Sequence, residues 1–394
     1  MSRIHKILFS IILLGFVLRI IVVFYSPDHF VFSDSVSYNQ IAHNILSGTG
    51  FHQTQTLQAV RPPLYSSFLA LIYLLNTNIL TIKILQTVIG CFSIFLVFIL
   101  AKKLLRNSNA ALIAAFLFAV DPLQIAFCSL VLTETWFCFL FLCSLLLLFE
   151  TRESSNSKNA VLLGCLCGIG SLFRTVLLPF VAFVGIFWMC SKRSQWRLVI
   201  VFWISTFIIM TPWIIRNAVV FGDFVPTTTK TGVNLYEALG PNATGGPRML
   251  IMKLPSGYSS LNEIQRDKFL RKKTWEFLKE NPFSPLYLAI VKFFRLWNIG
   301  FNDLKLRNLR YVNYAIMLFS CGLYICFFYG LLFLQKKNRF YLLLPILYVS
   351  LIHMIFLGSI RYRVPVLACL DIIAAIAIHR IFLQFTKIQN YIGE

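Results

Sequence analysis

Acidic side chains are rare in this chain of 394 residues, which has 15 Asp and Glu against 36 Lys and Arg. Asp34 follows the first long apolar segment, and Glu134 begins another. A carboxylate can take a proton from a reacting hydroxyl, and a guanidinium can hold a phosphate through two parallel hydrogen bonds. These residue types could therefore bind an anionic substrate beside a general base. The arginines at the ends of apolar segments are Arg61, Arg174, Arg216, Arg361 and Arg363.

Simpler interpretations exist for the same residues. Asp34 could cap the helix expected after it, and Glu134, next to Thr133, could stabilise the first turn of another helix. Arg61, like Arg19 inside the first apolar segment, could extend its charge to the membrane surface. Charges at a membrane boundary are costly and tend to mark function, so the structural and the functional interpretations both stay open.

The composition is that of a polytopic membrane protein. Hydrophobic residues make up 58% of the chain and charged residues 13%, against about 45–50% and 25% in soluble domains. The net charge of +21 lies largely in short clusters beside apolar segments, as membrane topology requires, so nucleic acid binding is not expected. All ten cysteines fall inside apolar stretches, which predicts no disulfide framework. Residues 7–25 have no cleavage site of the small-residue type after them and are expected to remain as a spanning helix.

The predicted fold is an all-α bundle with about ten membrane spans. Residues 160–190 are long for one helix and contain Arg174 and Pro179, which predicts two short helices that meet near Arg174. Ten crossings place every short basic cluster on the cytoplasmic side, provided that 62–76 and 284–298 lie at the outer boundary or dip into it. The eight segments long enough to cross alone, given a need for about 17–25 residues, are 7–25, 80–101, 109–128, 132–150, 198–220, 314–334, 340–359 and 361–380.

This topology brings the candidate residues to the outer face of the membrane. Residues 262–280 are predicted to form a basic amphipathic helix there, with Ile264, Phe269 and Trp275 among its apolar positions. Asp371, deep in the last span, needs a partner or a proton and receives no role. The expected parts of the chain are an N-terminal transmembrane catalytic module at 1–220 with its first outer loop at 27–62, an outer loop with juxtamembrane helices at 221–313, and C-terminal transmembrane helices at 314–394.

Five short motifs follow one another in a specific order. They are an Asp-x-x-x-Tyr helix (Asp34, Tyr38), Arg-Pro-Pro-Leu-Tyr (61–65), Thr-Glu-Thr-Trp-Phe (133–137), Pro-Trp-Ile-Ile-Arg-Asn (212–217) and Arg-Tyr-Arg-Val-Pro (361–365). Over nearly the whole chain this order resembles the bacterial branch of the protein O-mannosyltransferase and lipid A aminoarabinose transferase superfamily, glycosyltransferases of the family 39 type with the GT-C fold. Ser35 stands where the protein mannosyltransferases have the second acid of an Asp-Glu pair, so neither named substrate is assumed.

The resemblance implies transfer of a sugar from a polyprenyl-phosphate carrier to an acceptor on the non-cytoplasmic side of a bacterial inner membrane. It implies that Asp34 is catalytic and that Arg61 contacts the lipid phosphate. We expect an inverting single displacement, with a lipid, glycan or protein as acceptor. Whether a divalent metal takes part is left open, since the sequence has no compact His or Cys ligand pattern. The other expected site residues are Glu134, positioning Asp34, a sugar hydroxyl or a metal; Arg174 and one or both of Arg361 and Arg363 on the phosphate; and Tyr38, Tyr65 and Arg216 in the substrate pocket.

Two other classes of protein would also have many spans. A secondary transporter should show repeated halves and polar residues at mid-membrane, whereas the ionisable groups here mostly line one face. A lipid-binding membrane protein without catalysis would tolerate the loss of Asp34 and Arg61 together. Transport of a solute into vesicles would support the first class, and a neutral double substitution the second.

Overall fold

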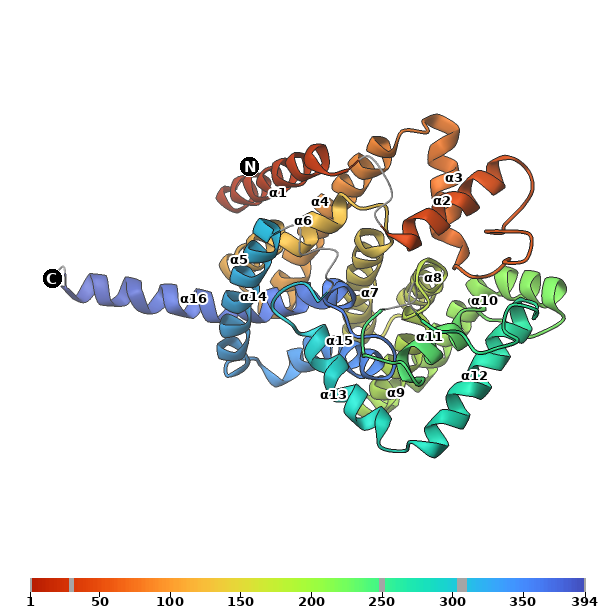
Figure 1. Cartoon of the computed structure of the whole chain (residues 1–394). Coiled ribbons are helices and arrows are strands. Elements are labelled where there is room, and N and C mark those ends of the chain that lie inside the picture. Colours follow the sequence, from red (N-terminus) through yellow and green to blue (C-terminus); the bar gives the residue numbers. More distant parts are fainter. Residues whose placement is uncertain (1, 28–31, 248–251, 303–309, 393–394) are drawn as a thin grey trace.

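The computed structural model describes residues 2–27, 32–247, 252–302 and 310–392, with residues 386–392 described by their backbone alone. Within these ranges the regular structure is helical, and the β-pairing is an isolated bridge between Thr54 and Leu57. The helices form one bundle, from which α16 extends outward (Figure 1). The prediction of an all-α polytopic bundle is therefore confirmed.

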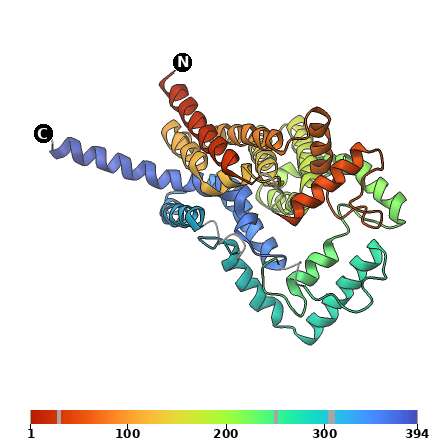
Figure 2. The same cartoon turned by 45° about the horizontal axis from the view of Figure 1, so that its top comes forward.

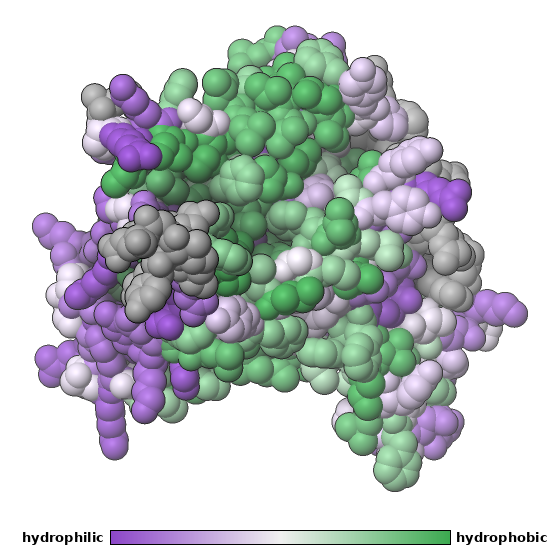
Figure 3. All heavy atoms as spheres, turned by 90° about the vertical axis from the view of Figure 1, so that its left-hand side faces the viewer, coloured by the Kyte–Doolittle hydropathy of each residue, from purple (hydrophilic) through white to green (hydrophobic). Residues whose placement is uncertain are grey.

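Seven helices of the described chain are long and apolar enough to cross a membrane. Figure 3 shows a broad band of hydrophobic residues over one face of the molecule, with hydrophilic residues beside it. Two of the spans include a short 3-10 helix before the α-helix, Arg193–Gln195 before α10 and Ile360–Val366 before α16. The α-helices in these spans are α1 (Arg3–Tyr25), α4 (Ile79–Leu105), α7 (Glu134–Ser154), α10 (Trp196–Phe221), α14 (Arg310–Leu331), α15 (Lys336–Ile355) and α16 (Leu367–Ile392).

The span predicted at 109–128 is broken into α5 (Ser108–Val120) and α6 (Pro122–Cys128), which meet at an angle of 53°. Pro122 has no N–H group to continue the first helix. Asp121 caps the second helix, because its carboxylate accepts a hydrogen bond of 2.7 Å from the N–H of Leu123. Asp121 therefore has a structural role at this bend.

The stretch 160–190 forms two short helices, as predicted. They are α8 (Ser157–Phe173) and α9 (Leu177–Ser191), and Arg174 is the first residue after α8. Both are shorter than the about 20 residues of a typical span, so the count of ten crossings stays a prediction. Helix α8 packs closely on α10 at Gly164, where a Cβ atom would lie 2.5 Å from the carbonyl oxygen of Phe202.

Short helices flank the bundle at the positions predicted not to cross. Helices α2 (Ser33–Leu46) and α3 (Pro63–Leu75) pack on each other. Helices α11 (Thr231–Leu239), α12 (Glu263–Glu280) and α13 (Ser284–Leu296) lie together at one side of the bundle (Figures 1 and 2). At 13 residues, α3 and α13 each measure roughly 20 Å, less than the hydrocarbon core of a bilayer.

One expectation about a side chain was wrong. Arg19 does not extend to the membrane surface; it is fully buried and donates hydrogen bonds to the carbonyl oxygens of Gly15 and Ala119, at 3.0 and 2.8 Å. The helix predicted at 262–280 is present as α12 and packs on α11; of its predicted apolar positions, Ile264 and Phe269 are partly buried and Trp275 is exposed. The buried residues of α12 are Glu263, Asp267, Leu270 and Thr274.

Candidate active site

Asp34 lies in the first turn of α2 and does not cap it. The capping position is Phe32, which makes no side-chain cap, so the capping prediction was wrong. Each oxygen of the Asp34 carboxylate instead accepts a hydrogen bond from an arginine: Oδ1 from Arg61 Nη2 at 2.6 Å, and Oδ2 from Arg361 Nη1 at 2.9 Å. Two guanidiniums therefore satisfy both oxygens of this carboxylate with charge-assisted hydrogen bonds.

Glu134 begins α7 and has the same kind of partners. Its Oε1 atom accepts hydrogen bonds from Arg174 Nη1 at 2.7 Å and from Arg361 Nε. Arg361 therefore joins the two carboxylates, and Glu134 positions this arginine instead of touching Asp34 directly. The Oε2 atom of Glu134 is buried with no hydrogen-bond partner among the described residues.

We call Asp34, Glu134, Arg61, Arg174 and Arg361 the carboxylate–guanidinium cluster. Its members come from the ends of separate elements: the starts of α2 and α7, the residue before Pro62 and α3, the break between α8 and α9, and the 3-10 helix before α16. The Asp34 side chain is 25% exposed and that of Glu134 0%, whereas the arginine side chains range from 12% to 16%. The cluster is thus partly open on the side of Asp34.

Aromatic rings surround the guanidiniums. The Arg61 guanidinium lies 5.1 Å from the ring centre of Tyr38, and that of Arg174 lies 5.5 Å from the ring of Tyr362. Tyr362 in turn stacks on His353, with ring centres 4.5 Å apart. Aromatic faces attract cations and exclude water, so they strengthen every charged interaction in the cluster.

Three candidates lie away from the cluster. Arg363, two residues after Arg361, is fully buried and donates to the carbonyl oxygens of Leu296 and Asn298. Tyr65 is buried behind Tyr38, and its hydroxyl donates to Gln86 at 3.0 Å. The third is Arg216, which donates to the carbonyl oxygens of Phe51 and Gln58. Asp371 on α16, to which no role was assigned, has carboxyl oxygens that are buried with no hydrogen-bond partner among the described residues.

Sequence reasoning did not find Lys230, which precedes α11. The positive charge of Lys230 attracts the Asp34 carboxylate and repels the Arg61 guanidinium. Burial lowers the pKa of Lys230 to about 8, and the charge of Arg61 lowers it as well, against the opposing charges of Asp34 and Glu237. Burial by itself raises the pKa of Asp34, but the charges of Arg61, Arg361 and Lys230 outweigh burial and hold that pKa well below its ordinary value. Asp34 is therefore ionised at neutral pH.

Glu263, also missed from the sequence, fixes the backbone next to two cations. Its carboxylate accepts hydrogen bonds from the N–H groups of Gln58 and Ala59, at 2.5 and 2.9 Å, and from the hydroxyl of Thr229. The N–H of Thr229 donates to the carbonyl oxygen of Ala59 at 3.0 Å. This network, which we call the Glu263 clamp, ties the segment before Arg61 to the segment before Lys230.

The residues that the structure describes do not form a metal site. Among the described residues, no three His, Cys, Asp or Glu side chains gather in one place. Both oxygens of Asp34 and the Oε1 atom of Glu134 already accept hydrogen bonds from guanidiniums.

Comparison with known proteins supports the resemblance. Residues 60–215 match the family model of dolichyl-phosphate-mannose-protein mannosyltransferases. This range includes Arg61, Glu134 and Arg174, and leaves out Asp34 and Arg361. No curated protein matches the chain. The resemblance predicted from the sequence is thus confirmed over the matched range.

Solved structures share the fold. The apo oligosaccharyltransferase from Archaeoglobus fulgidus aligns with a TM-score of 0.61 at 15% identity, over 99% of this chain and 52% of that one. The oligosaccharyltransferase AglB from Archaeoglobus fulgidus, in complex with an inhibitory peptide and a dolichol-phosphate, aligns with a TM-score of 0.57 at 14% identity, over 100% of this chain and 53% of that one. ArnT from Cupriavidus metallidurans bound to undecaprenyl phosphate aligns with a TM-score of 0.46 at 14% identity, over 93% and 77%.

The chain thus spans about half the length of the oligosaccharyltransferase that it matches. Together with the apolar helices and the family match, the two alignments with the archaeal oligosaccharyltransferase define the class: an integral membrane protein with the GT-C fold of membrane glycosyltransferases.

Proposed function

We propose that the protein is a glycosyltransferase that moves a sugar from a polyprenyl-phosphate donor to an acceptor hydroxyl. The observation that carries this proposal is the charge of the carboxylate–guanidinium cluster. Three guanidiniums are bonded to two carboxylates, which leaves one excess positive charge in a partly buried site. An excess charge next to apolar helices is costly unless an anion neutralises it. A phosphodiester carries one negative charge.

The nature of the donor is supported by the matches. The matched family model is named for dolichyl-phosphate-mannose, and AglB was solved with a dolichol-phosphate. A polyprenyl tail fits an apolar bundle, and the phosphate would bind Arg61, Arg174 and Arg361. Each guanidinium has five N–H groups, so it can bond a phosphate oxygen while it keeps a carboxylate partner.

Asp34 is the base in the proposed reaction. The bond between the sugar C1 and the phosphate oxygen breaks, and its electron pair leaves with the phosphate, where the guanidiniums stabilise the charge. The acceptor oxygen bonds to C1, and its proton passes to the Asp34 carboxylate. Because Glu134 is fully buried and bonded to two guanidiniums, Asp34 is the carboxylate of the cluster open to a substrate. One open carboxylate supports a single displacement, which inverts the anomeric centre.

The outer face of the membrane is the proposed side of the reaction. Basic residues meet at the end of the bundle opposite the cluster: Lys103 pairs with Glu150 at 2.5 Å, and Lys192 donates to the Arg152 carbonyl at 2.8 Å. Glu134 and Arg152 stand at opposite ends of α7, roughly 27 Å apart. Basic loops stay in the cytoplasm, so the cluster end belongs on the other side.

The test is turnover of lipid-linked donors by purified Asp34→Asn protein. Undecaprenyl-phosphate carrying mannose, glucose, galactose or aminoarabinose serves as the donor panel, and released undecaprenyl phosphate is measured. We expect a loss of about 10²–10⁴-fold with at least one donor cleaved by the wild type, since this is the usual contribution of a general base. Asp223→Asn, at a partly exposed acid paired with Lys268 on α12, is the matched control. Wild-type turnover by Asp34→Asn would remove Asp34 from the chemistry.

A further inference from the structure

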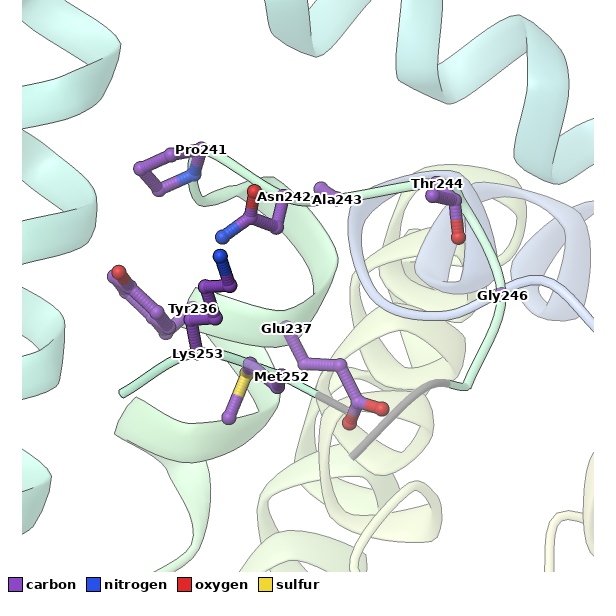
Figure 4. A pocket seen from close by; sticks show the side chains of 9 residues that line it. All are labelled: Tyr236, Glu237, Pro241, Asn242, Ala243, Thr244, Gly246, Met252 and Lys253. Carbon is purple, nitrogen blue, oxygen red and sulfur yellow. The ribbon is translucent and has the colours of Figure 1, made fainter. Parts of the chain in front are cut away.

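A cleft of about 420 Å³ lies in the outer layer of helices (Figure 4). It is enclosed by the end of α11, the turn that follows α11, and the segment at Met252 and Lys253. Its polar groups are a phenol, a carboxylate, an amide, a hydroxyl and an ammonium, which belong to Tyr236, Glu237, Asn242, Thr244 and Lys253. A volume of this size lies within the range of small-molecule sites, about 300–1,000 Å³.

The cleft is bounded by two segments that also reach the carboxylate–guanidinium cluster. Helix α11 begins directly after Lys230, whose charge acts on Asp34, and Glu237 in the same helix acts on Lys230. The carbonyl oxygen of Gly245 in the turn accepts a hydrogen bond of 2.8 Å from the N–H of Gly358, three residues before Arg361. A ligand in the cleft would therefore lie next to the segments that bring Lys230 and Arg361 to Asp34.

The turn that forms one wall is fixed in place. Gly245 has a φ angle of +81°, which favours glycine, and a Cβ atom at Gly246 would lie 2.1 Å from the guanidinium of Arg295 on α13. The turn is thus packed on α13 on one side and bonded to the Gly358 segment on the other. Such a wall holds Asn242 and Thr244 in defined positions before a ligand arrives.

The chemistry of the lining differs from that of the cluster. Glu237 and Lys253 contribute one negative and one positive charge, so the lining is balanced, whereas the cluster has an excess of positive charge. Amide, hydroxyl and carboxylate groups exchange hydrogen bonds with hydroxyls, and the face of a ring such as Tyr236 packs against apolar C–H groups. This set suits a neutral ligand with many hydroxyls better than a second phosphate or a lipid tail.

We propose that this cleft is the acceptor site, and that the acceptor is a carbohydrate whose hydroxyl is presented to Asp34. The inference rests on the proposed function, because it names the second substrate of the same reaction. The donor reaches the cluster from the apolar bundle, and the acceptor sugar reaches it from the outer layer of helices. The described lining of the cleft consists of α11, a turn and one short segment. These described residues contain no extended strand with which the backbone of a peptide could pair.

Binding is the first test, because it does not depend on turnover. Neutral oligosaccharides of two to four hexoses are mixed with purified protein, and saturation-transfer NMR measures their contact with it. We expect binding to the wild type and to Asp34→Asn, and a loss of at least tenfold in affinity for Asn242→Ala and for Lys253→Ala. Lys279→Ala, at an exposed lysine of α12, is the matched control, and thermal unfolding verifies that each variant is folded. Equal affinity in the cleft variants and the control would overturn the acceptor site.

Kinetics separates this inference from the proposed function. With a donor that the wild type cleaves, we expect the cleft variants to raise the acceptor KM at least tenfold, while kcat changes less than KM. Serine and threonine peptides are the competing acceptors, and a peptide that is glycosylated faster than every oligosaccharide would overturn the carbohydrate assignment alone. If no donor is cleaved by the wild type, the proposed function fails and this inference fails with it.

Discussion

Arg361 and Arg363 stand two residues apart in the 3-10 helix Ile360–Val366 and have different partners. Arg361 joins the carboxylates of Asp34 and Glu134, and its side chain is 16% exposed. Arg363 is fully buried and donates to two backbone carbonyl oxygens and to the hydroxyl of Ser320. The first arginine can exchange one anion for another, whereas the second is held where no ligand can reach it.

The same difference separates four other arginines. Arg61 and Arg174, like Arg361, bond to carboxylates at the edge of the bundle. Arg19 and Arg216 bond to backbone carbonyl oxygens, as Arg363 does. An arginine that bonds to fixed backbone carbonyl groups holds chain segments together. The bonding partners of an arginine therefore indicate its role better than its position at the end of an apolar segment does.

Among the substitutions that test this comparison, Arg361→Gln should have the largest effect on activity. It removes a charge from both carboxylates and from the proposed phosphate site, so we expect donor cleavage to fall at least about 100-fold, as for the loss of one electrostatic stabiliser. Release of undecaprenyl phosphate by the purified variant measures this. Activity within threefold of the wild type would show that Arg361 is a structural residue like Arg363.

Arg363→Gln should act mainly on stability. It removes charged hydrogen bonds to Leu296, Asn298 and Ser320, and each such bond contributes about 1.5–3 kcal/mol to the free energy of unfolding. We expect a lower Tm in a thermal unfolding assay and near-normal donor cleavage per folded molecule. A wild-type Tm together with lost activity would reverse the roles assigned to the two arginines.

Glu263→Gln tests whether the distant clamp sets the geometry of the cluster. Glu263 touches no member of the cluster, but it holds the backbone next to Arg61 and Lys230 through Ala59 and Thr229. We expect the donor KM to rise about tenfold, the amount expected when a positioning contact worth about 1.4 kcal/mol is lost. Gln265→Ala, at the exposed capping-box residue of the same helix, is the control. An unchanged donor KM would show that the Glu263 clamp does not contribute to donor binding.

The titration of Lys230 should make the affinity of the cluster for an anion modestly dependent on pH. Its pKa is lowered to about 8, so Lys230 is charged below this pH and neutral above it. Affinity for an anion is therefore expected to be full near pH 7 and to fall by up to about tenfold by pH 9, as one charge is lost. Lys230→Arg should keep its affinity across this range because arginine stays charged. The same decline in both proteins would exclude Lys230 as its source.

The fold could be predicted from the sequence because apolar length and short basic clusters carry the information for membrane helices. The break at Arg174 was predicted because residues 160–190 are long for one helix and contain Arg174 and Pro179. The sequence left open whether one or both of Arg361 and Arg363 would bind the phosphate, and their different partners become visible only in the structure. Local patterns failed where long-range charges decided the outcome. Asp34 is placed like a helix cap, but its partners come from residues 27 and 327 positions away along the chain.

Lys230 and Glu263 could not be found from sequence motifs. Both belong to the segment between α10 and α14, and their contacts with the first loop are set by the packing of α11 and α12. Nothing in the nearby sequence of Glu263 distinguishes it from the other acids of α12. Its burial and its bond to Ala59, 204 residues away, become visible only in three dimensions.

The most direct test of the central claim is the affinity of the purified protein for undecaprenyl phosphate against neutral undecaprenol. Tryptophan fluorescence or microscale thermophoresis in nanodiscs measures both lipids. If Arg61, Arg174 and Arg361 hold an anionic headgroup, the phosphate binds at least about tenfold more tightly than the alcohol, and Arg61→Gln removes most of this preference whereas Arg216→Gln keeps it. Equal affinity for the two lipids would contradict the account.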